Sequence, residues 1–415
     1  MRIQTKLSRK SQKESKPLSI IIYTVVAILF VVVVWLNIVV TKAGKSSLLE
    51  NDNLKPPPKP EKLEDRKGGA IIEDASLNDG EPTIKTPNGS VLPSAKALLS
   101  RPPPYGDSQV RFFSDTMIDS PNTVVTAYHR VPSKFHAGKY DEWMKNILSL
   151  QDAMVIFTSD DMVDQVKNMR QHALDRTVIV TLELNDLPYG TLYPTKFWED
   201  QLKRDPEKRI HRSYQLFWIW LSKSWFVNEA IRLNVFQSDL FMYSDIGCFR
   251  MKRYNSKTMI QHREVVPPNE MLQMAHHKPN PPKEDLFNDK YRHFENFYHS
   301  GSQSVAYKDT WIKFHEYFLD TIDRFLEKDM ILVEDQAILQ SVCLSHPEIC
   351  VYIPFTEVRD NHYFGLRYLV HYGGKFNFWS FNAGSPLIML DLANAVEQFG
   401  HVQSVYSSID FPESI

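Results

Sequence analysis

The sequence predicts an α/β fold in which a mostly parallel sheet flanked by helices follows a transmembrane helix and a disordered stem. Three observations support this prediction. From about residue 120 onward, short β-branched apolar runs alternate with amphipathic helical patterns, as in parallel sheets covered on both faces. Apolar residues make up 43% of the 415-residue chain, which is enough for a packed core. An uncharged stretch and a proline-rich segment precede this region.

The first element along the chain is the uncharged stretch from Pro17 to Thr41. About 20 apolar residues span the hydrocarbon core of a bilayer, whereas the apolar region of a signal peptide has only about 7–15. Residues 1–16 carry six basic side chains against one acid, so the positive-inside rule keeps this end in the cytosol. We therefore expect a cytosolic tail (1–17), a transmembrane signal anchor (18–41) and a single-pass type II protein of the Golgi or ER membrane.

The second element is a proline-rich stem over residues 42–118. Ten of the 25 prolines lie between Pro56 and Pro104. Such a composition buries too little apolar surface to offset the conformational entropy of the chain, so it predicts an extended tether. Asn88-Gly89-Ser90 is a glycosylation sequon, and we expect Asn88 to carry a glycan in the lumen. This layout is typical of Golgi glycosyltransferases, and type II proteases and sulfotransferases share it.

The remaining residues, 119–415, are expected to form the lumenal α/β domain. Buried strands are predicted over residues 123–128, 154–158, 177–182 and 239–250. Helices are predicted over residues 140–150, 161–174, 214–232, 311–329 and 334–345. Ligands of open α/β sheets bind at the carboxyl ends of the strands. Ser244 and Asp245 are expected at such an end.

Asp245 has two interpretations. A carboxylate just past a buried strand can hold a divalent cation that bridges phosphates, or it can cap a turn. Glu334 and Asp335, which begin a helix, are similarly ambiguous. Adjacent acids there stabilise the helix through its macrodipole, and one of them can also face a cleft as a general base toward an acceptor hydroxyl.

A polar stretch and the three cysteines are the remaining candidate features of the sequence. The polar stretch from Tyr298 to Ser302, with Gly301 at its centre, predicts either a plain loop or a close backbone approach to a sugar. Cys343 and Cys350 are close enough in sequence to form a disulfide in an oxidising lumen. Cys248 is expected to be a buried thiol.

Charge and missing motifs exclude several functions. The formal net charge of −2 argues against a nucleic-acid partner, since binding through bulk electrostatics requires a basic excess. The chain contains no Walker-type phosphate loop, no Gly-x-Gly-x-x-Gly, no His-Glu-x-x-His and no Gly-x-Ser-x-Gly. ATPase, dinucleotide oxidoreductase, zincin and α/β-hydrolase functions therefore lose support.

Several blocks in order carry a family resemblance. They are Thr123-Val-Val-Thr-Ala-Tyr128, the stretch from Lys223 to Phe236, Ser244-Asp-Ile-Gly-Cys-Phe-Arg250 and Glu334-Asp-Gln336. Over about 120–375 the chain resembles the HtrL/YibB-like family of glycosyltransferase-like proteins. The resemblance implies a single GT-A-like domain that binds a nucleotide-sugar donor with the aid of Mn²⁺ or Mg²⁺. The implied reaction moves the sugar to a hydroxyl of a glycan or glycoconjugate.

The resemblance also implies roles for individual residues. Asp245 and His371 would bind the metal, and the acceptor-side carboxylate would come from Glu334 or Asp335. The donor side would contain Thr126, Tyr128, Lys223, Ser244 and Gly301. The Asp-x-Asp metal motif of GT-A enzymes stands here as Asp-Ile-Gly, without the second aspartate.

Three functional hypotheses follow. The first is a lumenal glycosyltransferase that uses a nucleotide sugar and is held at the membrane by residues 18–41. The second is a non-catalytic binding or chaperone protein of the secretory pathway with the same fold, which the missing second aspartate supports. The third is a sulfotransferase, which the absence of a recognisable phosphate loop disfavours.

Overall fold

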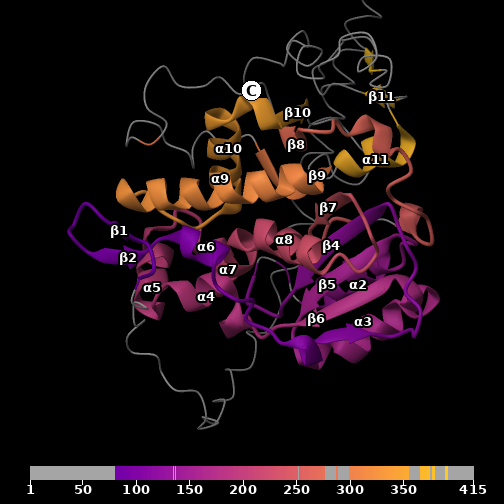
Figure 1. Ribbon diagram of the computed structural model, residues 1–415, viewed down its shortest axis with the longest axis horizontal. Helices are drawn as coiled ribbons and strands as arrows, with labels where there is room; N and C mark the ends of the chain where they lie inside the picture. The colour runs from indigo at the N-terminus through magenta and orange to yellow at the C-terminus, as the bar shows by residue number, and fades with distance from the viewer. Residues whose placement is uncertain are drawn as a thin grey trace, which may run out of the picture. The chain divides into compact units, whose positions relative to one another are not determined.

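Figure 1 shows the computed structural model of the chain. The structure describes residues 80–133, 135, 137–250, 252–275, 287, 299–354, 365–373, 376–378 and 388–390. The chain divides into two units, Met1–Ile71 and Ile72–Ile415, and every described residue belongs to the second. The expected cytosolic tail, signal anchor and first part of the stem lie outside the described residues. Within those residues, no helix is both long enough and apolar enough to cross a membrane.

An eight-stranded sheet forms the centre of the described domain, in the order β10-β8-β9-β7-β4-β5-β6-β3. Its strands are β3 (Val110–Phe112), β4 (Asn122–Tyr128), β5 (Ala153–Thr158), β6 (Thr177–Thr181), β7 (Leu240–Ser244), β8 (Met271–Ala275), β9 (His299–Tyr307) and β10 (Cys350–Pro354). Neighbouring strands β7, β4, β5 and β6 are parallel, as are β8 and β10, whereas β9 and β3 are antiparallel to their neighbours. The predicted α/β class with a mostly parallel sheet is confirmed.

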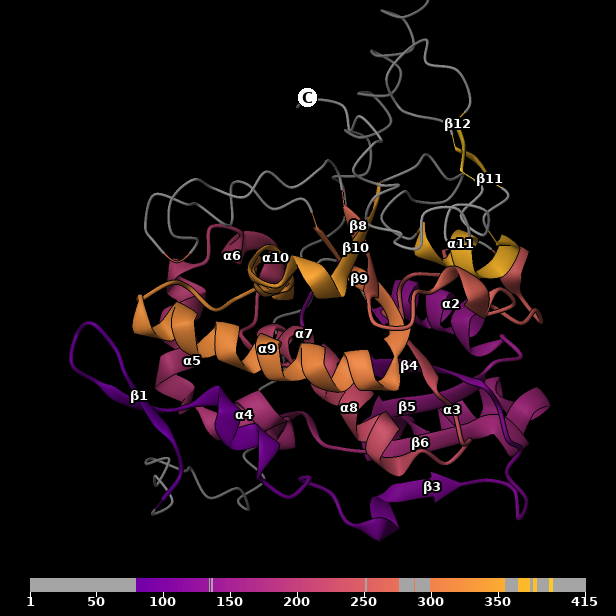
Figure 2. The ribbon, with the colours of Figure 1, turned by 45° about the horizontal axis from the view of Figure 1, so that its top comes forward.

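Helices cover both faces of this sheet (Figure 2). The α-helices are α2 (Ala137–Leu148), α3 (Val163–Met169), α4 (Pro188–Leu192), α5 (Thr195–Arg204), α6 (Lys208–His211), α7 (Gln215–Leu221), α8 (Lys223–Leu233), α9 (Lys308–Glu327), α10 (Asp335–Ser345) and α11 (Leu366–Tyr372). The 3₁₀ helices are η1 (Ala95–Leu99), η2 (Asp107–Gln109), η3 (Asp160–Met162), η4 (Gln171–Arg176), η5 (Leu184–Asp186), η6 (Lys252–Tyr254), η7 (Arg263–Val265) and η8 (Pro347–Ile349). Two small antiparallel pairs add β1 (Thr83–Lys85) with β2 (Val91–Pro93) and β11 (Phe376–Phe378) with β12 (Ile388–Leu390).

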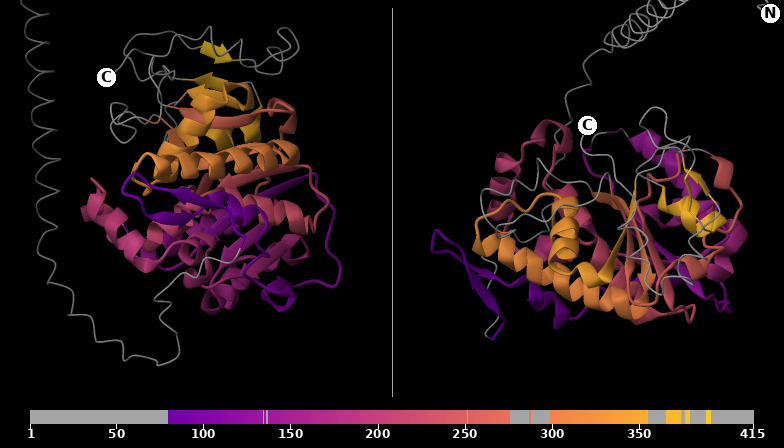
Figure 3. Two further views of the ribbon diagram at one scale, coloured as in Figure 1. Left: turned by 60° about the vertical axis from the view of Figure 1, so that its left-hand side comes forward. Right: turned by 90° about the horizontal axis from the view of Figure 1, so that it is seen from above.

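The core is divided by the sheet into two apolar clusters. Side chains of α4, α5, α7, α8, α9 and α10 pack on one face, and those of α2, α3 and α11 pack on the other. The view from above in Figure 3 shows the strands between these two layers. Strands β5, β6 and β7 are buried at every position, because both of their faces are covered. This double coverage explains why the sequence shows continuous apolar runs here instead of alternation.

Four predicted elements differ from the structure. The helix expected over 161–174 is η3, the short α3 and η4, and the strand expected over 239–250 ends at Ser244. The single helix expected over 214–232 is two helices, α7 and α8, separated at Ser222, so Lys223 is the first residue of a new helix. The polar stretch 298–302 was expected as a break, but β9 begins at His299. Several of its polar side chains form hydrogen bonds inside the protein; for example, Gln303 Nε2 donates to Ser244 Oγ at 3.1 Å. A strand whose polar side chains find such partners can therefore have the composition of a loop.

The folded domain begins earlier than the predicted boundary at 118. Ser94 and the backbone N–H of Ala95 donate hydrogen bonds to the buried carboxylate of Asp323 in α9. Ala95, Ala97 and Leu98 lie in the apolar core. The composition of residues 42–118 predicts a tether, but in residues 80–118 a few well-placed apolar side chains and one buried carboxylate hold the segment on the domain.

The three cysteines behave as the sequence indicated. Cys343 and Cys350 form a disulfide that joins the end of α10 to the start of β10. Cys248 is a buried free thiol. Asn88 of the glycosylation sequon is exposed in the turn between β1 and β2, where its Oδ1 accepts hydrogen bonds from Thr86 Oγ1 (2.6 Å) and the Ser90 N–H (3.0 Å). The sequon is therefore accessible at the surface of the described domain.

Candidate functional site

Lys223 is the centre of a buried charged cluster. Its Nζ donates to the carbonyl oxygen of Gly301 (2.7 Å) and forms ion pairs with Asp335 Oδ2 (2.8 Å) and Asp245 Oδ1 (3.2 Å). The four residues come from the start of α8, strand β9, the start of α10 and the end of β7. Lys223 is 7% exposed, so its ammonium interacts with these oxygens rather than with water.

Local structure positions each member of this cluster. The backbone N–H of Asp245 donates to the Ser302 carbonyl at 2.8 Å, which fixes the turn that follows β7. The Tyr243 hydroxyl donates to Asp245 Oδ1 at 3.2 Å. A Cβ atom at position 301 would lie 2.3 Å from Asp335 Oδ2, so only glycine allows β9 and α10 to approach this closely.

The cluster is electrostatically balanced around the ammonium. Burial opposes the charge of Lys223, but the carboxylates of Asp245 and Asp335 outweigh this and hold its pKa above the usual value. Burial raises the pKa of Asp335 to about 6, against the effect of Lys223. Burial likewise raises the pKa of Asp245, and Lys223 again opposes the shift. The cluster therefore depends on Lys223 for its stability.

This arrangement does not fit the metal ion expected at Asp245. Two carboxylates and a carbonyl oxygen are typical ligands of a hard divalent cation. Here the Lys223 ammonium lies within 3.2 Å of all three groups and already supplies their counter-charge. The second aspartate of the GT-A motif is absent as well.

A cavity of about 400 Å³ lies beside this cluster, at the carboxyl ends of β4 and β7. Asp245 belongs to both, because it pairs with Lys223 and also lines the cavity. Aromatic and apolar side chains form much of the wall, and two arginines contribute positive charge. These aromatic and arginine residues are Tyr128, Arg130, Phe135, Tyr140, Trp143, Trp220, Tyr243 and Arg250.

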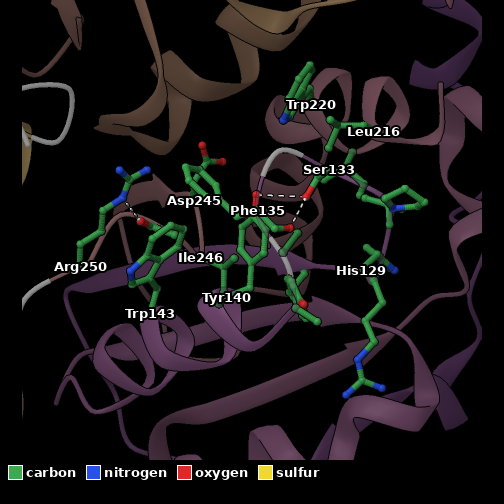
Figure 4. Close-up of a pocket in the computed structure, with 18 of the residues that line it drawn as sticks. His129, Ser133, Phe135, Tyr140, Trp143, Leu216, Trp220, Asp245, Ile246 and Arg250 are labelled. Atoms are coloured by element: carbon green, nitrogen blue, oxygen red, sulfur yellow. Dashed lines mark hydrogen bonds between the residues drawn. The ribbon is translucent and has the colours of Figure 1, made fainter. Parts of the chain in front are cut away.

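Figure 4 shows Arg250 and Trp143 together on one side of the cavity, with Trp220 and Leu216 on the other. The Arg250 guanidinium lies 4.4 Å from the Trp143 ring centroid, and its Nε donates to the Gly247 carbonyl at 3.4 Å. Stacking on an aromatic ring holds a guanidinium in one orientation, and the planar guanidinium matches the geometry of phosphate oxygens. Arg250 is therefore a candidate ligand for phosphate oxygens.

His129 lines the same cavity directly after β4. It is buried, and neither ring nitrogen has a hydrogen-bond partner among the described residues. Burial lowers its pKa to about 4, so the imidazole is neutral at physiological pH. A neutral ring with one donor and one acceptor suits a polar, uncharged group of a ligand. Neither His129 nor Arg250 is predicted as a site residue, although His129 directly follows the predicted strand 123–128 and Arg250 ends the predicted strand 239–250.

The structure separates the other residues expected at the site. Tyr128 lines the cavity, whereas Thr126 is buried within β4 and Ser244 is buried within β7. His371 lies on α11, where its Nδ1 is 2.9 Å from the Thr258 carbonyl and its ring packs edge-on against Tyr254. His371 is not among the described residues that line the cavity.

Glu334 and Asp335 are adjacent in sequence but point to different neighbours. Asp335 pairs with Lys223, as described above. Glu334 Oε1 lies 3.4 Å from His211 Nε2 of α6. Neither carboxylate lines the cavity, so the described residues leave Asp245 as the acid that faces it.

Comparisons with known proteins give one family match and a set of distant structural similarities, of which two are described. A family model described as "Bacterial protein of unknown function (HtrL_YibB)" matches residues 122–354. A search of curated proteins finds no match. Mouse xyloside xylosyltransferase 1, in its apo crystal structure, is similar with a TM-score of 0.34 and 9% identity, over 56% of this chain and 84% of that one.

The second similar structure is 4-diphosphocytidyl-2C-methyl-D-erythritol synthase from Anaerococcus prevotii DSM 20548. Its TM-score is 0.26 at 10% identity, over 56% of this chain and 86% of that one.

Proposed function

The chain belongs to the HtrL_YibB family, and we propose that its α/β domain is a glycosyltransferase that binds a nucleotide-sugar donor in the cavity beside Asp245. The observation that carries the proposal is the cavity itself. It combines aromatic walls, an arginine stacked on Trp143 and one carboxylate at the carboxyl ends of parallel strands. This is the edge at which open α/β sheets bind ligands.

The lining suits the parts of a nucleotide sugar. Aromatic rings such as Tyr140 and Trp220 can stack on a nucleobase or on the apolar face of a sugar. Arg250 matches the diphosphate, since a guanidinium binds phosphate oxygens in a bidentate manner. His129 can hydrogen-bond a sugar or ribose hydroxyl without adding charge. A volume of about 400 Å³ is within the range of small-molecule sites.

In the proposed reaction, the acceptor hydroxyl oxygen bonds to the anomeric carbon of the donor sugar, while the bond from that carbon to the diphosphate oxygen breaks. Asp245 accepts the proton of the acceptor hydroxyl, and the nucleoside diphosphate leaves with the electron pair of the broken bond. Arg250 offsets the charge that develops on the leaving group. Lys223 holds Asp245 in place from the protein side.

The cellular setting of this proposal comes from the sequence. The uncharged stretch 18–41 and the basic tail before it support a single-pass type II protein whose domain lies in the lumen of the Golgi or ER. The Asn88 sequon and the Cys343–Cys350 disulfide are compatible with an oxidising lumen. The acceptor would then be a glycan or glycoconjugate that passes through this compartment.

A direct test measures donor binding by the purified chain. A panel of nucleoside diphosphates and nucleotide sugars is screened by thermal shift, since a ligand that binds the native state raises the apparent stability. Arg250→Gln should weaken binding of the best ligand at least tenfold, about 1.4 kcal/mol. Arg111→Gln is the matched control, because Arg111 lies on edge strand β3 and pairs only with Asp160 at the surface among the described contacts. If nothing in the panel binds, the proposal is wrong.

A second candidate is a non-catalytic binding protein with the same cavity. One observation favours it: Asp245 is already paired with Lys223, and no other acid lines the described cavity. Slow hydrolysis of a bound nucleotide sugar, lost in Asp245→Asn, would identify the enzyme. Tight binding without hydrolysis or transfer across the donor panel would identify the binding protein.

A further inference from the structure

A second charged cluster lies outside the cavity, where α6 meets the start of α10. His211, at the end of α6, is surrounded by three carboxylates. Its Nε2 lies 3.3 Å from Glu207 Oε2 and 3.4 Å from Glu334 Oε1, and its Nδ1 lies 2.7 Å from Asp205 Oδ2. His211, Asp205 and Glu334 are buried, whereas the Glu207 side chain is half exposed.

Asp205 sets the orientation of the imidazole. Its Oδ2 accepts the Nδ1–H of His211, and its Oδ1 accepts the Glu207 backbone N–H at 2.8 Å. In that tautomer the lone pair of Nε2 points toward Glu207 and Glu334. A histidine that binds a metal through one ring nitrogen usually donates the N–H of its other ring nitrogen to a carboxylate. Asp205 is that carboxylate here. The Trp220 ring, 4.9 Å away and perpendicular, packs against the imidazole and limits its rotation.

The charges of this cluster are not compensated by its own residues. Even a protonated His211 offsets only one of the three carboxylates. Glu334 Oε2 is buried and has no hydrogen-bond partner among the described residues. A buried carboxylate oxygen without a partner is costly unless the carboxylate coordinates a metal.

We propose that Glu207, His211 and Glu334 bind a divalent transition-metal ion, with Zn²⁺ as the best fit. Zn²⁺ accepts both imidazole nitrogen and carboxylate oxygen, whereas Mg²⁺ and Ca²⁺ prefer oxygen ligands. Ligands about 2.0–2.1 Å from a tetrahedral ion lie about 3.3–3.4 Å from one another. His211 Nε2 lies 3.3 and 3.4 Å from the carboxylate oxygens of Glu207 and Glu334, which matches this ligand-to-ligand distance. All three ligand atoms lie within 4.8 Å of one another. A water beside Glu207 would complete the coordination.

The bound ion would link α6 to the first turn of α10. Asp335, which follows Glu334 directly, pairs with Lys223 and thereby with Asp245. The ion is therefore placed to hold the start of α10 against the charged cluster behind the cavity. This role is independent of the proposed transferase activity, because none of the three ligands lines the cavity.

The test is a metal-binding measurement on the purified full-length chain without an affinity tag. After dialysis against a chelator, Zn²⁺ alone is titrated into the wild-type protein, His211→Asn and Glu334→Gln. We expect one equivalent to bind the wild type and each ligand variant to bind at least tenfold more weakly. Asp205→Asn should weaken binding about 10–100-fold through the orientation of His211. Glu199→Gln, an exposed acid on nearby α5, is the matched control and should bind like the wild type.

Two further readouts separate a metal site from a network of ion pairs. Co²⁺ bound in place of Zn²⁺ should show the intense visible absorption of tetrahedral coordination, and His211→Asn should abolish it. Zn²⁺ should raise the melting temperature of the wild type but not of Glu334→Gln, which without metal should melt no lower than the wild type. The proposal is overturned if the ligand variants bind Zn²⁺ like the wild type, or if Glu334→Gln is destabilised without metal and Zn²⁺ leaves the wild type unchanged. Asp245→Asn should still bind Zn²⁺, which keeps this result apart from the proposed function.

Discussion

At the scale of single residues, the candidate site depends on close approaches that leave no room for substitution. Gly301, Lys223 and Asp335 illustrate this: the first allows the backbone to approach, the second supplies the charge and the third fills the space that a side chain at 301 would need. Each of these roles predicts a measurable cost on mutation.

Gly301→Ala should destabilise the protein by about 2 kcal/mol or more, the cost of forcing an extra carbon into a packed site. Its Cβ would lie 2.3 Å from Asp335 Oδ2 and would displace the carboxylate from Lys223. Urea denaturation measures the change in the free energy of unfolding. Gly106→Ala is the control, because no atom lies within 4 Å of a Cβ at that position. Equal losses in the two variants would contradict the close-packing argument.

Lys223→Met should cost about 3–5 kcal/mol, since it leaves the carboxylates of Asp245 and Asp335 close together without a counter-charge. Lys96→Met removes a surface ion pair with Asp320, and its cost should stay below about 1 kcal/mol. The same denaturation experiment compares the two lysines. A small loss in Lys223→Met would show that the cluster contributes little to stability.

His129 should make the protein less stable in acid. Its pKa is about 4 in the folded protein and near 6.5 when unfolded. Between these values the unfolded chain binds more protons, so the free energy of unfolding falls as the pH drops from 6.5 to 4, by up to about 3 kcal/mol. Urea titrations at pH 7 and pH 4 should show a smaller acid-induced loss in His129→Gln than in the wild type. Parallel losses would mean that His129 is hydrated in the folded state.

At the scale of elements, the segment before the sheet is part of the domain. Residues 94–98 pack on α9, where Ser94 and Ala95 satisfy the carboxylate of Asp323. Tyr105 reaches α8, and its hydroxyl donates to Glu229 Oε2 at 2.6 Å. The sequence predicts that residues 94–98 and Tyr105 belong to the stem, because their neighbours are polar and rich in proline.

A chain that begins at Ser108 should therefore be less stable than one that begins at Gly80. The shorter chain leaves Asp323 buried without its two donors and exposes the apolar surface that Leu98 and Tyr105 cover, for a loss of about 3 kcal/mol or more. Melting temperatures of the two chains measure the difference. Equal melting temperatures would restore the boundary near 118 that the composition predicts.

At the scale of the whole molecule, the glycosylation site at Asn88 can be used to test the proposed membrane orientation. Asn88 is exposed in the turn between β1 and β2, so a lumenal domain should carry a glycan there. The full chain expressed in mammalian cells should shift in mobility after glycosidase treatment, and Asn88→Gln should remove the shift. An unglycosylated wild-type chain whose C-terminus is open to protease in intact microsomes would contradict the type II orientation.

The sequence alone was sufficient for features that depend on neighbouring residues. Continuous apolar runs identified β4, β5, β6 and β7, and the period of Trp311, Phe314 and Phe318 identified α9, because burial on known faces leaves a local pattern. The end of β7 located Asp245. Glu207 and His211 are four residues apart, a spacing that places two side chains on one face of a helix, so this pair can also be read from the sequence.

Tertiary structure alone decided which of these residues meet. Lys223 is separated by 22 residues from Asp245 and by 78 from Gly301, so nothing near it in sequence indicates its charged partners. The cluster forms because β9 pairs with β7 from the opposite direction and brings Gly301 beside the end of β7 and the start of α10. Glu334, one residue before Asp335, lies beside His211 and not in the cavity. Local periodicity specifies which face of an element is buried, but the partner across that face is set by strand order, which a local pattern does not encode.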